Sequence, residues 1–321
     1  MLAMKKISIE EEIREAMKKS KKAFSKEMLD RLTVLLGRLD EKCPPQPYLP
    51  LKPMRAASTT VFDSKLGGVP YFPKDMEYPS VLEGEFAGKP LKLLAQLNFA
   101  ELPHLEGFPE KGILQFFAGC DGDDVYGIDF NDYFAQNGFR VIYHENIIED
   151  TGKLMSVEDL PSLGSGGEDL PFIGEFLLRA GEPCFRGIAP SDFRFASAVA
   201  ESFNELFGGD VAGMWVDSDG KKGIFQVDEA LYHAIDEVRS AYGTGIGGFP
   251  YFTQQDIRSC DERYRACDTV LFQLDSEFGE GIDSWEDEIM WGDSGVGNFF
   301  ISAGNLAKRD FSKVLYTWDC C

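Results

Sequence analysis

The chain has 321 residues, enough for one large domain or two ordinary ones, and 44% of them are hydrophobic, which supplies a substantial core. Its net charge of −22 repels phosphate backbones and argues against nucleic acid as a partner. No apolar run approaches the ~18–20 residues that span a bilayer and no signal peptide is evident, so we expect a cytoplasmic protein without a membrane partner.

Residues 1–43 are expected to form an N-terminal helical extension. The spacing of apolar residues predicts a helix over 8–24, where Ser8 and Glu11 make a capping box, and a second helix over 26–41, which together would form a hairpin. Residues 1–42 carry 11 Lys/Arg and 8 Asp/Glu, a net charge of +3, which leaves −25 for the rest of the chain. The apolar stripes of these helices must be buried, either on the chain's own body or against a partner or a second copy.

Residues 43–53 are rich in proline, which fixes φ and donates no backbone hydrogen bond. The segment cannot be helical, and we interpret it as an extended connector. A second domain, residues 44–321, is expected to begin there. The seven cysteines show neither the spacing of a disulfide framework nor that of a zinc site, which suits reduced thiols in the cytoplasm.

One stretch occurs twice: Leu66-Gly67-Gly68-Val69-Pro70-Tyr71-Phe72-Pro73 returns 180 positions later as Ile246-Gly247-Gly248-Phe249-Pro250-Tyr251-Phe252-Thr253. Three further segments match in the same order, at offsets of 177, 183 and 173: 93–98 with 270–275, 112–117 with 295–300, and 140–143 with 313–316. The kept order indicates an internal duplication of one supersecondary unit, about 55–148 and 245–321.

Short strands separated by turn residues are predicted in the first unit, at 58–62, 91–98, 113–118, 125–130 and 139–144. Such short intervals favour antiparallel sheet. Between the units, an inserted segment is predicted to contain a loop, a helix, a hairpin and a second helix, at 157–174, 191–207, 214–227 and 228–242. The expected fold class is α+β: internally duplicated, mainly antiparallel sheet units with flanking helices, preceded by the N-terminal helical hairpin.

Several of these segments resemble the YwqG-like family, a bacterial family whose domain has no assigned function. The resemblance covers about 48–321 and rests on residues 64–74, 90–99 and 108–117 and on Trp291-Gly292-Asp293. It implies a compact α+β body with internal pseudo-symmetry, and it offers no catalytic residues to carry over. Some members are thought to be encoded near secreted-toxin systems, which implies an immunity or interaction role.

Motifs that could carry chemistry each have a simpler interpretation. Gly292-Asp293-Ser294-Gly295 matches a protease nucleophile motif, but the three histidines lie in no recognisable context, so we expect a turn. Residues 243–248 satisfy G-x-G-x-x-G, but a predicted helix precedes them, which favours a helix end and a turn over a dinucleotide site. The acidic segments 121–124, 217–220 and 283–293 lack calcium-loop spacing. We therefore expect no catalytic residues, no metal and no cofactor.

Four amides sit at matching points inside apolar strands: Gln96 with Gln273, and Gln115 with Asn298. A buried amide needs partners, because an unpaired one costs about 1–3 kcal/mol. Each amide either ties its strand to a neighbouring loop, such as the Gly-Gly-x-Pro-Tyr loop, or lines a ligand pocket between the two halves. The candidate ligand-binding residues under the second interpretation are Tyr71, Gln96, Tyr251, Gln273, Trp291 and Asp293.

Two functions remain open from the sequence. The first is a non-catalytic binding or interaction module whose acidic surface engages a basic protein partner, in the manner of an immunity protein. The second is an enzyme or small-ligand-binding protein that uses a cleft between the two halves. The sequence leaves the oligomeric state undecided.

Overall fold

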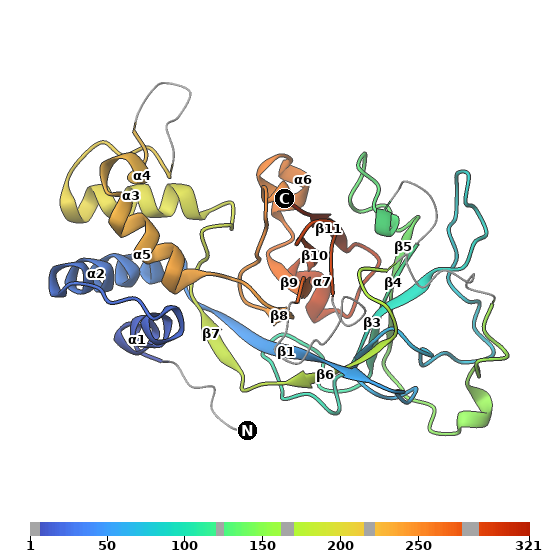
Figure 1. The fold of residues 1–321 in the computed structure, drawn as a ribbon. Coiled ribbons are helices and arrows are strands. Elements are labelled where there is room, and N and C mark those ends of the chain that lie inside the picture. The colour runs from blue at the N-terminus through green and yellow to red at the C-terminus, as the bar shows by residue number, and fades with distance from the viewer. Residues whose placement is uncertain (1–6, 120–124, 162–169, 215–221, 278–288) are drawn as a thin grey trace.

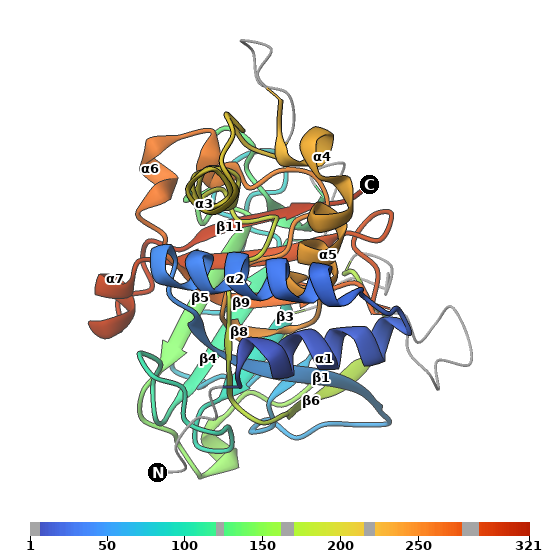
Figure 2. The same cartoon turned by 90° about the vertical axis from the view of Figure 1, so that its left-hand side faces the viewer.

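The computed structural model describes residues 7–119, 125–161, 170–214, 222–277 and 289–321. These residues form a mixed helix-and-sheet protein, in which a curled antiparallel sheet makes the body and most helices gather at one side of it (Figures 1 and 2). The α-helices of the described residues are α1 (Ile9–Ser20), α2 (Lys26–Lys42), α3 (Phe195–Phe207), α4 (Ile224–Val227), α5 (Glu229–Arg239), α6 (Glu262–Arg265) and α7 (Ala303–Ala307). The strands are β1 (Gln46–Ala56), β2 (Lys65–Leu66), β3 (Lys92–Asn98), β4 (Ile113–Ala118), β5 (Phe139–His144), β6 (Glu175–Ala180), β7 (Cys184–Arg186), β8 (Gly245–Gly247), β9 (Thr269–Asp275), β10 (Val296–Ile301) and β11 (Leu315–Asp319).

The strand order of the sheet is β11-β10-β9-β8-β1-β6-β2-β3-β4-β5, with β7 paired to β1. Every strand pairing in the described sheet is antiparallel, as the short strand intervals predict. Strands β2 to β5 form one wing and β8 to β11 form the other, in mirrored order about the central pair β1 and β6. We call these wings the first half and the second half.

The proline-rich segment is extended, as predicted, but it is the central strand β1 and not a connector. Its prolines take part in the sheet as acceptors, since a proline lacks only the N–H group. The backbone N–H of Gly248 donates to Pro47 O at 2.8 Å, and that of Gly181 donates to Pro50 O at 2.9 Å. Proline has no backbone N–H to donate and is therefore rare in central strands. Here the prolines are accommodated because their carbonyl oxygens accept hydrogen bonds from the neighbouring strands.

The last strands of the two halves correspond at a different offset from the sequence match. Gln115 lies opposite Ile142 of β5, and Asn298 lies opposite Thr317 of β11. These pairs place the two strands at an offset of 175, whereas the matched segments suggested 173. A shift of two residues keeps the same side chains on the same face, so the apolar pattern cannot detect it.

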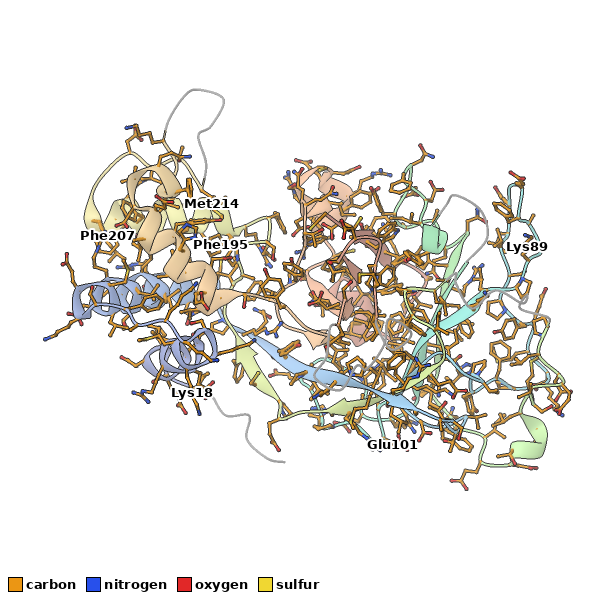
Figure 3. All side chains as sticks on the ribbon, in the orientation of Figure 1. Lys18, Lys89, Glu101, Phe195, Phe207 and Met214 are labelled. Carbon is orange, nitrogen blue, oxygen red and sulfur yellow. The ribbon has the colours of Figure 1, made fainter. Side chains whose placement is uncertain are left out.

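Aromatic rings fill the inside of the curled sheet, between the two halves. The ring of Phe116 lies 5.0 Å from that of Phe272 and 4.7 Å from that of Phe299. Phe299 in turn stacks on Tyr316 at 4.4 Å. Figure 3 shows side chains crowding this space. The halves are therefore joined by a packed core.

Helices α1 to α5 form a second cluster beside the sheet, which we call the helical lobe (Figure 2). The leucine stripe of α2 is buried there, and Phe195 of α3 belongs to the same cluster, whereas Lys18 of α1 is exposed (Figure 3). The apolar faces of α1 and α2 thus pack on the chain's own helices. Ion pairs at the edge of this contact support it: Lys42 with Glu201 and Glu205, the partly buried Arg31 with Asp228, and Lys22 with Glu237.

Several predicted elements differ from the structure. No strand forms at residues 58–62, and 125–127 is a single 3₁₀ turn in place of the predicted strand. Gly127 adopts a φ of 73°, outside the extended region that a strand requires, and a Cβ there would lie 1.9 Å from Gly138 O. Within the predicted hairpin 214–227, residues 224–227 form α4, while 215–221 lie outside the described residues. Strands β6 and β7 were not predicted.

Candidate functional site

The amide of Gln96 holds the first glycine loop against its strand. Its Oε1 accepts from the backbone N–H of Tyr71 at 2.9 Å and from Gln115 Nε2 at 2.8 Å. Its Nε2 donates to the carbonyls of Val61 and Asp63, both at 2.9 Å. The side chain is fully buried, and all four of its hydrogen-bonding positions are used. Nothing on this amide is left for a ligand.

Three of these four contacts have a counterpart at Gln273 in the second half. Its Oε1 accepts from the N–H of Tyr251 at 2.8 Å, and its Nε2 donates to Ala241 O at 2.9 Å and Gly243 O at 2.7 Å. Asn298 Nδ2 donates to Tyr251 O at 2.8 Å, as Gln115 donates in the first half. These bonds confirm the interpretation that each amide ties its strand to a Gly-Gly-x-Pro-Tyr loop.

The structure brings the candidate ligand-binding residues together in pairs but not as one site. Tyr71 and Gln96 belong to the first half, and Tyr251 and Gln273 to the second, with β8, β1, β6 and β2 between their strands β9 and β3. Trp291 is fully buried, while Asp293, two residues on, is exposed. The space between the halves, where these side chains were expected to meet, holds the aromatic core.

His144 extends the amide network of the first half. Gln115 Nε2 already donates to Tyr71 O, so its Oε1 must accept from His144 Nε2 at 2.9 Å, which fixes the proton on that ring nitrogen. The imidazole is 8% exposed and lies edge-on to the ring of Tyr71 at 5.0 Å. Burial lowers the pKa of His144 to about 4, so it is neutral at physiological pH.

Because of His144, the free energy of unfolding should decrease as the pH is lowered. The ordinary pKa is 6.5 and the folded one about 4, so the unfolded chain binds this proton first as the pH drops. The contribution is complete above pH 6.5 and is lost towards pH 4, about 3 kcal/mol in all. We expect urea unfolding at pH 7 and pH 4.5 to show a smaller pH effect for His144→Gln than for the unmodified chain. Replacing the exposed His233 by Gln should leave the pH effect intact. An equal difference in unfolding free energy between pH 7 and pH 4.5 for all three proteins would contradict the assignment.

The end of β9 carries two carboxyl groups with raised pKa values. Burial raises the pKa of Asp275 to about 6, although the N–H of Gly243 donates to its Oδ2 at 2.6 Å. Burial also raises the pKa of Glu277, whose Oε1 accepts from Thr244 Oγ1 at 3.3 Å. Because its pKa is raised on folding, Asp275 makes the folded state more stable as the pH drops, the opposite of the effect of His144. The effect of His144 is therefore measured by comparing variants. Its counterpart in the first half is Asn98, and this exchange of amide for acid was the sequence signal that could have singled it out.

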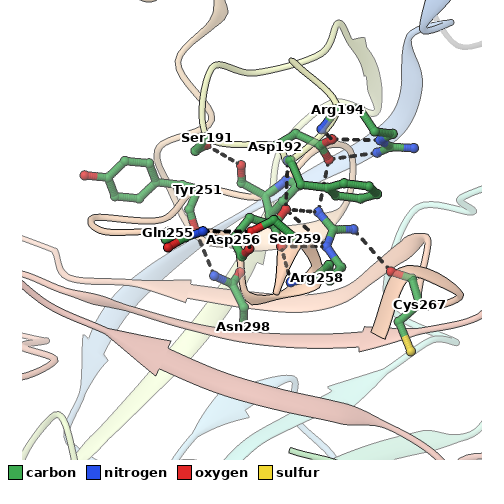
Figure 4. Close-up of polar contacts among 12 residues, drawn as sticks. Ser191, Asp192, Arg194, Tyr251, Gln255, Asp256, Arg258, Ser259, Cys267 and Asn298 are labelled. Atoms are coloured by element: carbon green, nitrogen blue, oxygen red, sulfur yellow. Dashed lines mark hydrogen bonds and ion pairs between the residues drawn. The ribbon is translucent and has the colours of Figure 1, made fainter. Parts of the chain in front are cut away.

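A buried ion network connects the helical lobe to the second half (Figure 4). Arg258 is fully buried, and its Nη2 donates to Asp256 at 2.6 Å and to Asp192 at 3.0 Å. Its Nη1 donates to Cys267 O at 3.2 Å. Arg194 donates to both oxygens of Asp192 at 2.7 Å. Burial acts to raise the pKa of that carboxyl, but the bonds and charges of Arg194 and Arg258 outweigh burial and leave the pKa lowered. The charges are paired with one another, which is the arrangement that buried ions require.

Sequence reasoning missed this network, although a local signal was present. Asp192-Phe193-Arg194 and Asp256-Ile257-Arg258 share a D-x-R spacing, and in each the arginine Nε donates to the aspartate two residues earlier. The exposed pair Asp261 and Arg263 repeats it at 2.8 Å. The D-x-R spacing predicts the bond between neighbours in the sequence. It does not predict the bond from Arg258 to Asp192, which are 66 residues apart.

A groove with a volume of about 410 Å³ lies where the two halves meet the start of β1. We call it the inter-half groove. It is bounded by residues 106–108 of the first half, by 45–47, and by Gly247, Gly248 and α7 of the second half. The second copy of the glycine loop therefore faces it. None of the six candidate residues lines the groove.

The remaining motifs form a turn or a short strand, or fall outside the described residues. Gly292 and Ser294 have positive φ values of 53° and 63°, and the backbone turns there before β10, as expected. Residues 243–248 were expected to be a helix end followed by a turn, but α5 ends at Arg239 and residues 245–247 form the short strand β8. The acidic segments 121–124 and 217–220, and Asp283 to Glu288, lie outside the described residues. Within the described ranges, no group of three His, Cys, Asp or Glu side chains is placed to hold a metal ion.

No helix in the described part of the chain is both long enough and apolar enough to cross a membrane. Comparison with protein-family models matches residues 64–320 to a family described as Domain of unknown function (DUF1963). This match covers most of the range over which the motifs resemble the YwqG-like family, and the two are consistent. Among curated proteins, no match was found.

Proposed function

The chain belongs to the DUF1963 family, and we propose that it is a non-catalytic, protein-binding member of YwqG-like type whose acidic surface engages a basic partner protein. An immunity-like role, in which the partner is neutralised by binding, fits this proposal. The proposed location is the cytoplasm, with neither nucleic acid nor membrane as a partner.

The observation that carries the proposal is the way this chain docks its own basic segment. Residues 1–42 carry a net charge of +3, and their described helices α1 and α2 pack on helices that present Glu201 and Glu205 to Lys42 and Glu237 to Lys22. Residues 43–321 have a net charge of −25, far more than this segment neutralises. Exposed ion pairs add little affinity individually, but a surface of one sign steers a partner of the other sign and selects its orientation.

Affinity capture with the full chain tests the proposal. We expect one strongly basic protein to be retained in a fixed ratio at 50 mM salt and released at about 500 mM. The Debye length is ~10 Å at 0.1 M salt and shorter at higher concentrations, so the higher salt screens the attraction between the two surfaces. Reversing an exposed charge, Glu106→Lys at the inter-half groove against Glu77→Lys elsewhere, reports whether the groove takes part. A neutral or acidic partner, a complex insensitive to salt, or turnover of a substrate without any partner would overturn it.

A second candidate function is supported by the inter-half groove itself. Its volume of about 410 Å³ is within the ~300–1,000 Å³ of small-molecule sites, and both halves contribute to its wall. The exposed Ala307 lines it, so Ala307→Phe should fill it without disturbing the core. If a small ligand binds there, a metabolite extract should raise the melting temperature of the unmodified chain but not that of this variant.

We infer that the two halves are copies of one unit. The support is the mirrored strand order together with hydrogen bonds that match atom for atom, Tyr71 to Gln96 in one half and Tyr251 to Gln273 in the other. Both loops also place their paired glycines at φ values between 65° and 72°, where only glycine is unstrained.

A further inference from the structure

Each half carries a pair of aromatic rings beside its glycine loop, and the two pairs differ in how far they are covered. In the first half, the ring of Phe62 lies 6.0 Å from that of Tyr71. In the second half, Tyr242 and Tyr251 occupy the positions 180 residues on, and their rings lie 4.2 Å apart. Tyr71 is fully buried, whereas Tyr251 is half-buried and Tyr242 is 53% exposed. We call Tyr242 and Tyr251 the tyrosine pair.

The backbone that carries each pair is held in the same way. In each half the glutamine amide of the adjoining strand donates to the two carbonyls that flank the first ring, Phe62 or Tyr242. The oxygen of the same amide accepts from the N–H of the second ring, Tyr71 or Tyr251. The pairs therefore lie at corresponding places on the sheet, and the cover of the first pair indicates what fits the second.

A segment of the chain itself covers the first pair. Residues 147–155 lie against Tyr71 and contribute aliphatic side chains to the cluster around it, among them Ile147 and Ile148. The N–H of Ile148 donates to the Tyr71 hydroxyl at 2.8 Å. The segment then pairs antiparallel with the loop at 72–74. Two consecutive isoleucines and one backbone N–H are thus the groups that bury this tyrosine.

Part of the corresponding surface in the second half is already occupied. The N–H of Lys74 donates to Lys153 O in the covering segment at 2.9 Å. The N–H of Gln254, 180 residues on, donates instead to Asp319 Oδ2 at 2.8 Å. The surface that stays exposed is therefore that of the tyrosine pair itself, which is large enough for only a short segment.

The margin of the tyrosine pair is acidic. Gly243, next to Tyr242, donates its N–H to Asp275 Oδ2 at 2.6 Å, and Asp319 is the second carboxylate. Arg186 lies against the same segment, but its Nη1 and Nη2 atoms both donate to backbone carbonyls there, at 3.2 and 3.0 Å. Two carboxylates against one arginine favour a ligand that carries positive charge beside its apolar side chains.

We propose that the tyrosine pair docks a short segment of the basic partner protein, in the way that residues 147–148 cover Tyr71. Two consecutive aliphatic side chains lie against the rings of Tyr242 and Tyr251, one N–H of the segment donates to the Tyr251 hydroxyl, and a neighbouring lysine or arginine lies beside the two carboxylates. In Figure 4 the ring of Tyr251 points away from the buried ion network. Exposed tyrosines are frequent hot spots of interfaces, because they offer a large apolar area with few rotatable bonds. The docking site follows from the contacts of the two halves, and only the origin of the segment rests on the proposed function.

A peptide tests the docking site without the partner. The probe is fluorescein-labelled KKNIIKK, which repeats residues 146–148 between lysines, and its matched control is KKNSSKK. By fluorescence anisotropy with the full chain, we expect the probe to bind at least about tenfold more tightly than the control, because the two peptides have equal charge and differ only in the aliphatic side chains. Equal affinities, or no binding of the probe up to ~1 mM, would overturn the proposal.

Two variants locate the site. Tyr242 is exposed, so Tyr242→Ser should leave the fold intact while the affinity for KKNIIKK falls at least about fivefold. Phe130→Ser removes an aromatic ring that is 63% exposed in the first half, and it should leave the affinity unchanged. Weaker binding in both variants, or in neither, would place the peptide elsewhere and overturn the proposal.

Affinity capture with the same variants assigns the segment to the partner. We expect Tyr242→Ser to retain at least about fivefold less of the basic protein at 50 mM salt, and Phe130→Ser to retain it in full. Full retention by the Tyr242 variant would overturn the proposed docking of the partner and leave the proposed function standing. Peptide binding without any captured basic protein would overturn the proposed function and leave the docking site standing. A dimer that depends on Tyr242 in sedimentation velocity would make a second copy the occupant and overturn the proposal.

Discussion

Replacing Arg258 by methionine should destabilise the protein by about 3–5 kcal/mol, which is the usual effect of removing one partner from a buried ion network. Asp192 and Asp256 are 2% and 3% exposed, and both receive hydrogen bonds from this guanidinium. The substitution leaves the buried Asp256 without its cation, removes one of the two arginines that bond Asp192, and leaves Cys267 O without its donor. Urea unfolding, followed by circular dichroism at neutral pH, measures the change.

The matched control for this prediction is Arg263→Met. Arg263 donates to Asp261 with the same D-x-R spacing, but its side chain is 58% exposed. Water replaces the lost contact there, so we expect a change of less than about 1 kcal/mol. Adding Asp256→Asn to Arg258→Met should recover part of the loss, since Asp192 keeps Arg194 and no buried carboxylate then lacks a cation. Similar stabilities for the two arginine variants would show that the network contributes little.

The network matters because it fixes the position of the helical lobe. Asp192 and Arg194 lie just before α3, whereas Asp256 and Arg258 lie in the segment that crosses the second half (Figure 4). Ser191 Oγ donates to Pro250 O at 2.7 Å and strengthens the same joint. We expect the Arg258 variant to loosen the lobe first, so the amides of α3 should exchange with solvent faster than those of β3.

The parts of the fold that could be predicted are those with a local signal. Strands β3, β4 and β9 are apolar runs between turn residues. The two Gly-Gly-x-Pro-Tyr stretches indicate where each half begins. Strand β1 carries the opposite local signal, because its prolines argue against a strand within a sheet. Its place at the centre is decided by carbonyl acceptors and by strands from distant parts of the chain.

The candidate sites depended on contacts that no spacing reveals. Asp192 and Arg258 are 66 residues apart, and Arg239 meets Glu12 across most of the chain. The matched amides Gln96 and Gln273 could be found from the matching sequence segments, but the sequence could not decide whether they face a loop or a ligand. Whether these amides contact a loop or a ligand depends on what covers the face of the strand on which they lie. That covering depends on the fold of the whole sheet.

Replacing Gln96 by leucine should destabilise the first half by about 4 kcal/mol, the second large effect that we expect. Leucine keeps most of the volume but leaves the N–H of Tyr71, the carbonyls of Val61 and Asp63, and Gln115 Nε2 with fewer partners in a buried site. Each lost buried hydrogen bond typically costs about 1–3 kcal/mol, and some relaxation of the loop reduces the sum. Urea unfolding of the full chain measures the loss.

Gln255→Leu is the control, because Gln255 is exposed and donates only to Ser259 at 2.9 Å among the described contacts. It should stay within about 0.5 kcal/mol of the unmodified chain. Gln273→Leu should lie between the two, since its loop residue Tyr251 is half-buried and water can replace part of the lost bonding. The competing interpretation, in which Gln96 recognises a ligand, predicts the reverse for Gln96→Leu. Stability would then be unchanged and any ligand-induced rise in melting temperature would disappear, and that result would remove the amide from the structural role assigned to it.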